Sequence, residues 1–293
     1  MHTQQNVVSR CLIIYFSLGG TTKLVAESIA AGLLAAGYQI DLHDMLVGKP
    51  PDPRDYDLLG IGSPTQYFRA PFKVLDCVQA LPDLDGLAAF VFVLYGAIGG
   101  DAGKQIRHAL SRKNAHDVGC FSCLGADYYL PYLLQGYLFS PEHPTEAELS
   151  KAEEFGRQVA ARKTSPVDFK AGEDKPLAAI YRLERFLVHR CLVQQVYSRM
   201  FRVIKDRCTV CDLCIQECPM RNIAKGADTY PVFGRNCLLC LNCEMKCPED
   251  AIKSPVTGLL FWPFLKYNVS AILRDSVVDN VRVKHRKGKT QRL

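Results

Sequence analysis

The 293-residue sequence lacks the marks of several protein classes. It contains no uninterrupted apolar run of the ~20 residues that a membrane-spanning helix needs. The best candidate, Gly258–Leu265, is short and contains Pro263. The N-terminus has no basic stretch followed by a long apolar segment and a small-residue cleavage site. We therefore expect no transmembrane segment, no secretory signal and a cytoplasmic protein.

Recognisable catalytic groups are also missing. The Gly-x4-Gly-Lys-Ser/Thr spacing of a nucleoside triphosphate loop is absent, and no second dinucleotide fingerprint is present. No nucleophile or acid–base pair stands in a familiar setting, and the histidines are scattered. The catalytic residues therefore stay unknown, and nicotinamide is not expected as the electron source.

Charge is distributed unevenly. Residues 1–163 carry 14 Lys and Arg against 17 Asp and Glu, whereas the remainder carries 22 against 13. A basic half could attract nucleic acid or anionic lipid, but no nucleic-acid-reading motif accompanies the charge. We therefore do not expect nucleic-acid binding.

The first half alternates short apolar runs with amphipathic stretches, the pattern of strands and crossover helices in a parallel sheet. Length favours two units rather than one. A capping box of Thr145 and Glu148 marks the start of the last helix of this half. The predicted strands are Cys11–Phe16, Gln39–His43, Tyr56–Gly62, Ala88–Leu94 and Val118–Leu124, and the predicted helices are Thr21–Ala36, Pro71–Leu81, Lys104–Ala115 and Thr145–Lys163. The sequence therefore predicts an α/β, doubly wound, five-stranded parallel sheet over residues 1–163.

The second half is divided differently. Residues 164–206 are predicted to form a polar linker, 164–175, and one long connecting helix, Leu177–Ile204. Residues 207–254 are predicted to form a second, smaller domain that holds the cysteine runs. Residues 255–293 form an aromatic segment and a basic C-terminal tail that we expect to be frayed. A long stretch after the fifth strand, 127–144, is either a lid or docking surface, or a cover for apolar surface.

Eight of the 13 cysteines lie in two matching runs. Cys208-x2-Cys211-x2-Cys214-x3-Cys218-Pro219 recurs as Cys237-x2-Cys240-x2-Cys243-x3-Cys247-Pro248. Three thiolates on one tight loop can each hold one iron of a cubane, but the loop cannot reach the fourth iron. Zinc is an alternative, although structural zinc sites usually pair two Cys-x2-Cys units. Cys120 and Cys123 fall within one predicted strand and are interpreted as buried small residues.

The two runs resemble those of bacterial ferredoxins with two [4Fe–4S] clusters, in which the last cysteine of each run ligates the other cluster. The resemblance implies a smaller α+β domain for residues 207–254, with one cluster on Cys208, Cys211, Cys214 and Cys247. It implies a second cluster on Cys237, Cys240, Cys243 and Cys218.

Directly after the first predicted strand, a short glycine-containing loop leads into a helix. Its residues are Ser17, Leu18, Gly19, Gly20, Thr21 and Thr22. Backbone amides at a helix start, flanked by hydroxyls, suit a bound phosphate. The loop resembles the flavodoxin pattern Ser/Thr-x-Thr-Gly-Asn-Thr at Ser17, Gly20 and Thr22, and departs from it at Gly19 and Thr21. The resemblance implies FMN as the ligand, with its phosphate in this loop.

Two further loops follow the third and fourth predicted strands and resemble the flavin loops of flavodoxins. The first, Pro64, Thr65, Gln66, Tyr67 and Phe68, is expected to cover one flank of the flavin ring. The second, Tyr95, Gly96, Ala97, Ile98, Gly99 and Gly100, is expected to face the polar edge of the ring.

A flavodoxin-like half joined to a two-cluster ferredoxin half is similar to the ferredoxin–flavodoxin fusion proteins of the EFR1 family. The resemblance implies an iron–sulfur flavoprotein, an electron-transfer protein or oxidoreductase that relays electrons to or from a redox partner protein. Reduced ferredoxin or another low-potential donor is the expected electron source. Two alternatives stay open: an FMN-dependent reductase of a small molecule, and a cluster-bearing sensor or binding module without flavin.

Overall fold

The computed structural model describes residues 8–162, 179–259 and 261–293. Within this part the chain divides into two compact units. The first holds residues 8–95, 99–125 and 142–162. The second holds 96–98, 126–141, 179–259 and 261–293. None of the described helices is both long and apolar enough to cross a membrane.

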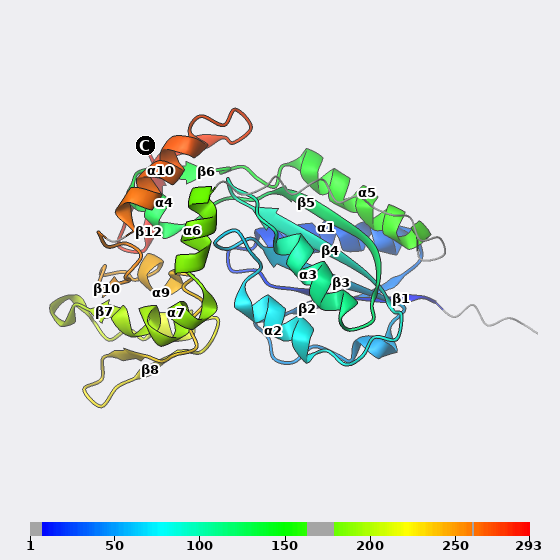
Figure 1. Ribbon diagram of the computed structural model, residues 1–293, viewed down its shortest axis with the longest axis horizontal. Helices are drawn as coiled ribbons and strands as arrows, with labels where there is room; N and C mark the ends of the chain where they lie inside the picture. Colours follow the sequence, from blue (N-terminus) through cyan, green and yellow to red (C-terminus); the bar gives the residue numbers. More distant parts are fainter. Residues whose placement is uncertain (1–7, 163–178, 260) are drawn as a thin grey trace, which may run out of the picture. The chain divides into compact units, whose positions relative to one another are not determined.

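The first unit is built on the predicted five-stranded parallel sheet (Figure 1). Its strand order is β2-β1-β3-β4-β5, so the chain turns outward from β1 in both directions. The strands are β1 (Arg10–Tyr15), β2 (Gln39–Asp44), β3 (Leu58–Pro64), β4 (Ala88–Tyr95) and β5 (His116–Leu124). The doubly wound α/β class is therefore confirmed, with strand ends within two residues of those predicted.

Helices cover both faces of this sheet. One face is covered by α1 (Thr21–Ala35) and α5 (Glu146–Arg162), which pack against each other and supply Val25, Ile29 and Phe155 to the core. The other two helices, α2 (Phe72–Ala80) and α3 (Ala102–Ser111), also pack against each other (Figure 1). A short 3-10 turn, η1, spans Pro53–Asp55. Burial of the apolar stripe of each helix against the sheet stabilises this layered arrangement.

The predicted capping box at the start of α5 is confirmed. The Thr145 N–H donates to Glu148 Oε2 at 2.7 Å, and the Glu148 N–H donates to Thr145 Oγ1 at 3.3 Å. Glu148 Oε1 also accepts from the N–H of Leu124 at the end of β5. One carboxylate therefore fixes both the helix start and the last residue of the neighbouring strand.

The predicted long helix Leu177–Ile204 is wrong. The described part of that range instead contains α6 (Ala179–Leu187), α7 (Arg190–Gln195), the 3-10 turn η2 (Tyr197–Met200) and the short strand β7 (Arg202–Val203). The break falls at His189, whose backbone is extended and whose Nδ1 accepts the N–H of Cys191 as an N-cap. The predicted linker 164–175 lies outside the described residues.

The cysteine region of the second unit consists of two similar halves. The first contains β7, the 3-10 turn η3 (Lys205–Arg207) and the short helix α8 (Leu213–Gln216), and the second contains the short helix α9 (Asn242–Met245). β8 (Ile223–Lys225) pairs with β9 (Pro231–Phe233), and β7 pairs with β10 (Ile252–Lys253). The sequence repeat is thus also a structural repeat.

The basic C-terminal segment is not frayed, contrary to expectation. It forms the hairpin of β11 (Asn280–Arg286) and β12 (Lys289–Arg292), and β11 also pairs with β6 (Tyr137–Phe139). Leu133, Leu138 and Val283 form a small buried core beneath this sheet. Two more helices belong to the unit, α4 (Leu130–Leu134) and α10 (Trp262–Ile272). The prediction was wrong because the pairing partner of β11 lies far away in the sequence, within the stretch after β5.

Candidate functional site

Three predicted binding loops follow the carboxyl ends of β1, β3 and β4. These strands are direct neighbours in the parallel sheet, so their carboxyl ends lie at one edge. Ligands of doubly wound sheets bind beyond this edge. The first-unit parts of the three loops are therefore brought together by the fold.

The loop after β1 has the geometry of an anion site. Ser17 Oγ accepts the N–H groups of Gly20 at 3.1 Å and Lys23 at 3.4 Å, which folds the loop back over the helix start. Gly20 has a left-handed φ of 89° and precedes α1 without a side-chain cap. The first turn of α1 contains no acidic residue, so the N–H groups of Thr21 and Thr22 at the positive end of the helix suit an anion.

The loop after β3 is a tight turn with unusual backbone angles. Gln66 and Arg69 pair through two backbone hydrogen bonds, and Tyr67 and Phe68 between them have φ values of 50° and 62°. Aromatic residues rarely adopt these angles, which cost on the order of 1–3 kcal/mol each. Phe68 is buried, whereas Tyr67 is half-buried. Such strain is typical of a segment shaped for a ligand, and no sequence pattern had indicated it.

The loop after β4 contacts the turn of residues 66–69 through its end in the first unit. The N–H of Asp101 donates to the Phe68 carbonyl at 3.3 Å, and the N–H of Thr65 donates to the Leu94 carbonyl at 2.6 Å. A Cβ at Gly100 would lie 2.4 Å from the Phe68 carbonyl oxygen, so only glycine fits there. Residues 96–98 in the middle of the loop group with the second unit.

In the second unit, the first predicted cluster set is gathered around one pocket. Cys208, Cys211, Cys214 and Cys247 all line it. Cys247 comes from the second cysteine run and the other three from the first. Burial raises the pKa of Cys214 to about 11, and the nearby charges of Cys211, Cys247 and Cys208 add to this shift. The thiols of both runs are therefore close enough to influence one another.

The second predicted set likewise combines one cysteine of the first run with three of the second. Burial raises the pKa of Cys240 to about 12, with further contributions from Cys237 and Cys218. Burial likewise raises the pKa of Cys243, on which Cys240, Cys237 and Cys218 also act. Cys218 of the first run thus lies near the three cysteines of the second. Since iron binds the thiolate, loading this set would release protons.

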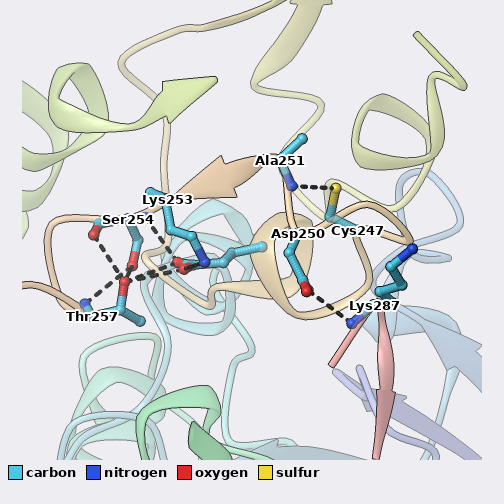
Figure 2. Close-up of polar contacts among 8 residues, drawn as sticks. Cys247, Asp250, Ala251, Lys253, Ser254, Thr257 and Lys287 are labelled. Atoms are coloured by element: carbon cyan, nitrogen blue, oxygen red, sulfur yellow. Dashed lines mark hydrogen bonds and ion pairs between the residues drawn. The ribbon is translucent and has the colours of Figure 1, made fainter. Parts of the chain in front are cut away.

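The two runs share an unusual backbone that the sequence did not reveal. Val210 and Asp212 have φ values of 54° and 59°, and the matching residues Leu239 and Leu241 have 58° and 61°. Each run also ends in the same hydrogen bond to sulfur: Asn222 N–H to Cys218 Sγ and Ala251 N–H to Cys247 Sγ, both 3.3 Å. Figure 2 shows the second of these bonds. Four non-glycine residues in the left-handed region are costly, and their recurrence indicates a functional constraint.

Within residues 8–162, 179–259 and 261–293, no three His, Cys, Asp or Glu side chains converge to hold a single metal ion. A zinc ion needs its sulfur ligands at ~2.3 Å from one centre. Each thiolate of a cubane instead binds its own iron, so these sulfurs surround a larger volume.

The fold and the loops at its carboxyl edge define a flavodoxin-like domain. Residues 12–132 match the family model described as a flavodoxin domain. The match ends before the cysteine runs.

Several solved structures are similar to about half of this chain. Flavodoxin 1 from Bacillus cereus is 19% identical, covers 52% of this chain and 98% of its own, and has a TM-score of 0.43. The flavodoxin of Megasphaera elsdenii is 20% identical, with coverages of 52% and 98% and a TM-score of 0.40. The Flv1 flavodiiron core from Synechocystis is 18% identical, with coverages of 55% and 37% and a TM-score of 0.42.

Proposed function

We propose that this chain is an iron–sulfur flavoprotein that transfers electrons between two [4Fe–4S] clusters and FMN, and relays them to or from a redox partner protein. When bound, the clusters pass one electron at a time, whereas the flavin holds one or two. The chain could therefore collect single electrons and deliver a pair, or the reverse.

One observation carries the cluster half of the proposal: Cys247 of the second run lines the same pocket as Cys208, Cys211 and Cys214 of the first. Cubane ligation by two interleaved runs requires this crossing. Cys218 acts in turn on the three cysteines of the second run. The N–H groups of Asn222 and Ala251 would then hold negative charge on the sulfur of Cys218 and Cys247.

The flavin half is supported by the match to the flavodoxin domain and by the first-unit parts of the three loops, which follow neighbouring strands of the sheet. The amides of Thr21 and Thr22 would bind the phosphate, while Ser17 holds the loop closed. The half-buried Tyr67, held in a strained turn, would stack on the ring and exclude water from one side.

The alternative of a small-molecule reductase depended on residues 127–144 acting as a lid. Most of this stretch, residues 127–141, instead belongs to the second unit, where β6 pairs with β11 and Phe139 is fully buried. A segment held in this way resists opening, which favours the relay over the reductase.

Anaerobic purification with iron, sulfide and FMN quantified per chain tests the proposal. About eight iron atoms and one FMN per chain are expected. Cys218→Ser and Cys247→Ser should each lose about half of the iron and of the visible cluster absorption. Cys77→Ser, which changes a cysteine of α2 outside both sets, is the matched control and should lose none. Stoichiometric zinc without iron, or unchanged iron in both ligand variants, would contradict the cluster assignment.

A further inference from the structure

The C-terminal hairpin carries a concentrated positive charge on its outer surface. Between residues 280 and 293 there is no Asp or Glu, and all six basic residues are exposed: Arg282, Lys284, Arg286, Lys287, Lys289 and Arg292. Along β11 the inward position is taken by Val283, which is 2% exposed. Since side chains alternate along a strand, Lys284 and Arg286 flank buried or half-buried positions and face outward together with the turn.

The turn of this hairpin lies on the cysteine loop of the second run. The N–H of Lys287 donates to Asp250 Oδ1 at 2.8 Å (Figure 2). Lys287 and Gly288 have φ values of 51° and 71°, as a two-residue hairpin turn requires. A Cβ at Gly288 would lie 2.8 Å from the Lys246 carbonyl oxygen, directly before Cys247. The positive charge is therefore fixed beside a predicted cluster ligand.

Three of these basic residues have no ion-pair partner in the part of the chain that the structure describes. Lys287 Nζ lies 3.6 Å from Glu249 Oε2, but no ion pair among the described residues involves Lys284, Arg286 or Lys289. These three exposed cations repel one another at low salt. An anionic surface that approached the hairpin would relieve this repulsion, and the approach would be steered by the field.

The neighbouring cysteine site is the more accessible of the two. Cys211 and Thr209 are exposed in the first run, whereas the equivalent loop of the second run contains the buried residues Leu238, Leu239 and Leu241. An external electron carrier reaches an exposed site more readily than a buried one. The hairpin thus lies against Cys247, the ligand that completes the accessible set.

We propose that the C-terminal hairpin is the docking surface for an acidic one-electron carrier protein, placed to exchange electrons with the site of Cys208, Cys211, Cys214 and Cys247. The inference rests on the proposed function and specifies its partner. In the forward direction the reduced centre of the carrier loses one electron and the cluster gains it, with no bond formed or broken.

An acidic protein fits this surface better than other anions do. The segment 280–293 contains no Phe, Tyr or Trp, and His285 is half-buried, so it offers no exposed aromatic platform on which nucleotide bases could stack. Its only strongly exposed large apolar side chain is Leu293, so it lacks the apolar face that inserts into a lipid surface. Charge without apolar surface suits a transient protein complex that must dissociate after each transfer.

The test uses the full cofactor-loaded chain and a small acidic [2Fe–2S] ferredoxin as the probe. Charge reversal by Lys284→Glu, Arg286→Glu and Lys289→Glu together should raise the Kd for the probe by about tenfold or more at low salt. Replacing the same three residues by Gln should raise this Kd by a smaller factor. The control makes the same charge change in the first unit, at the exposed residues Lys49, Lys104 and Lys151, and should leave the Kd within about twofold.

The proposal would be overturned by an unchanged Kd in the charge-reversed hairpin variant, or by an equal rise of the Kd in the control. So would tighter binding to phosphatidylserine vesicles or to single-stranded DNA than to the ferredoxin. Iron and FMN are counted in every variant. If no form holds iron, the proposed function fails, whereas a charge-dependent Kd for the probe would still stand as a separate result.

Discussion

Ser140 anchors the loop that follows β4. Its hydroxyl donates to the Gly96 carbonyl at 2.5 Å, and its own N–H donates to the Asp279 carbonyl at 2.7 Å. Ser140 is fully buried and has a left-handed φ of 49°. One residue of the stretch 126–141 therefore connects a predicted flavin loop, at Gly96, to the segment leading into β11.

Removing this hydroxyl should weaken flavin binding. Ser140→Ala leaves the Gly96 carbonyl without its donor and should cost about 1 kcal/mol, which corresponds to an approximately fivefold rise in the Kd for FMN. Titration of the apoprotein with FMN by fluorescence measures this. Ser111→Ala, which removes an exposed hydroxyl bonded to the His108 carbonyl at the end of α3, should not change the Kd. An unchanged Kd for Ser140→Ala would show that the hydrogen bond from Ser140 to Gly96 does not support FMN binding.

Two glycines at opposite ends of α1 provide a matched pair for the phosphate loop. Gly20 and Gly37 both have φ of 89°, and a Cβ at either would meet open space. Gly20→Ala and Gly37→Ala should therefore lose similar stability, about 1–2 kcal/mol each in urea unfolding. Only Gly20→Ala should weaken FMN binding, by about tenfold, since relaxing this residue turns the loop amides away from the phosphate. Equal affinity in the two variants would argue against the loop as the phosphate site.

The capping carboxylate Glu148 should make the stability of the first unit depend on acid pH. Burial opposes its ionisation, but the bonds from the Thr145 N–H, His143 and the Thr145 hydroxyl outweigh burial and hold the pKa of Glu148 below its usual value. A carboxyl with a lowered folded pKa stabilises the fold above its unfolded pKa of ~4.3, and that stability is lost as the pH falls through the folded pKa.

Glu148→Gln should therefore be about 1 kcal/mol less stable than the parent at neutral pH, with a smaller difference near about pH 3. Urea unfolding at both pH values measures the change. The exposed Glu146→Gln, in the same helical turn, is the control and should lose less stability than Glu148→Gln at neutral pH. A constant difference at both pH values would show that ionisation of Glu148 is not the cause.

The buried carboxyl of Glu184 should have the opposite effect on stability, which should fall as the pH rises. It is 3% exposed, burial raises its pKa, and its hydrogen bond from Asn268 Nδ2 at 2.8 Å only partly offsets this. Above the unfolded pKa of ~4.3 the unfolded carboxyl ionises more readily than the folded one, so stability falls as the pH rises toward the folded pKa. Glu184→Gln keeps an acceptor for Asn268 and should be more stable than the parent at pH above neutral. Greater instability of this variant at every pH would show that the charge itself is needed.

The sequence could predict the elements that depend on local pattern. The five strands and their helices follow from apolar runs and periodicity, and the capping box of Thr145 and Glu148 from a three-residue spacing. The break at His189 could not be predicted, because apolar residues continue at helical spacing on both sides of it and the interruption is a backbone N-cap. The strained angles of Tyr67 and Phe68 were equally hidden, since tertiary contacts impose them against local preference.

The amino-acid sequence by itself determined the chemistry available to this protein: two cysteine runs of matching spacing, and a glycine turn between a strand and a helix. These depend only on residue type and short separations along the chain. Tertiary structure alone decided that residues 126–141 join the second unit, that the basic C-terminus becomes a hairpin, and that its turn lies against the backbone before Cys247. Those contacts join segments more than a hundred residues apart or depend on a close backbone approach, and neither feature leaves a periodic signal in the sequence.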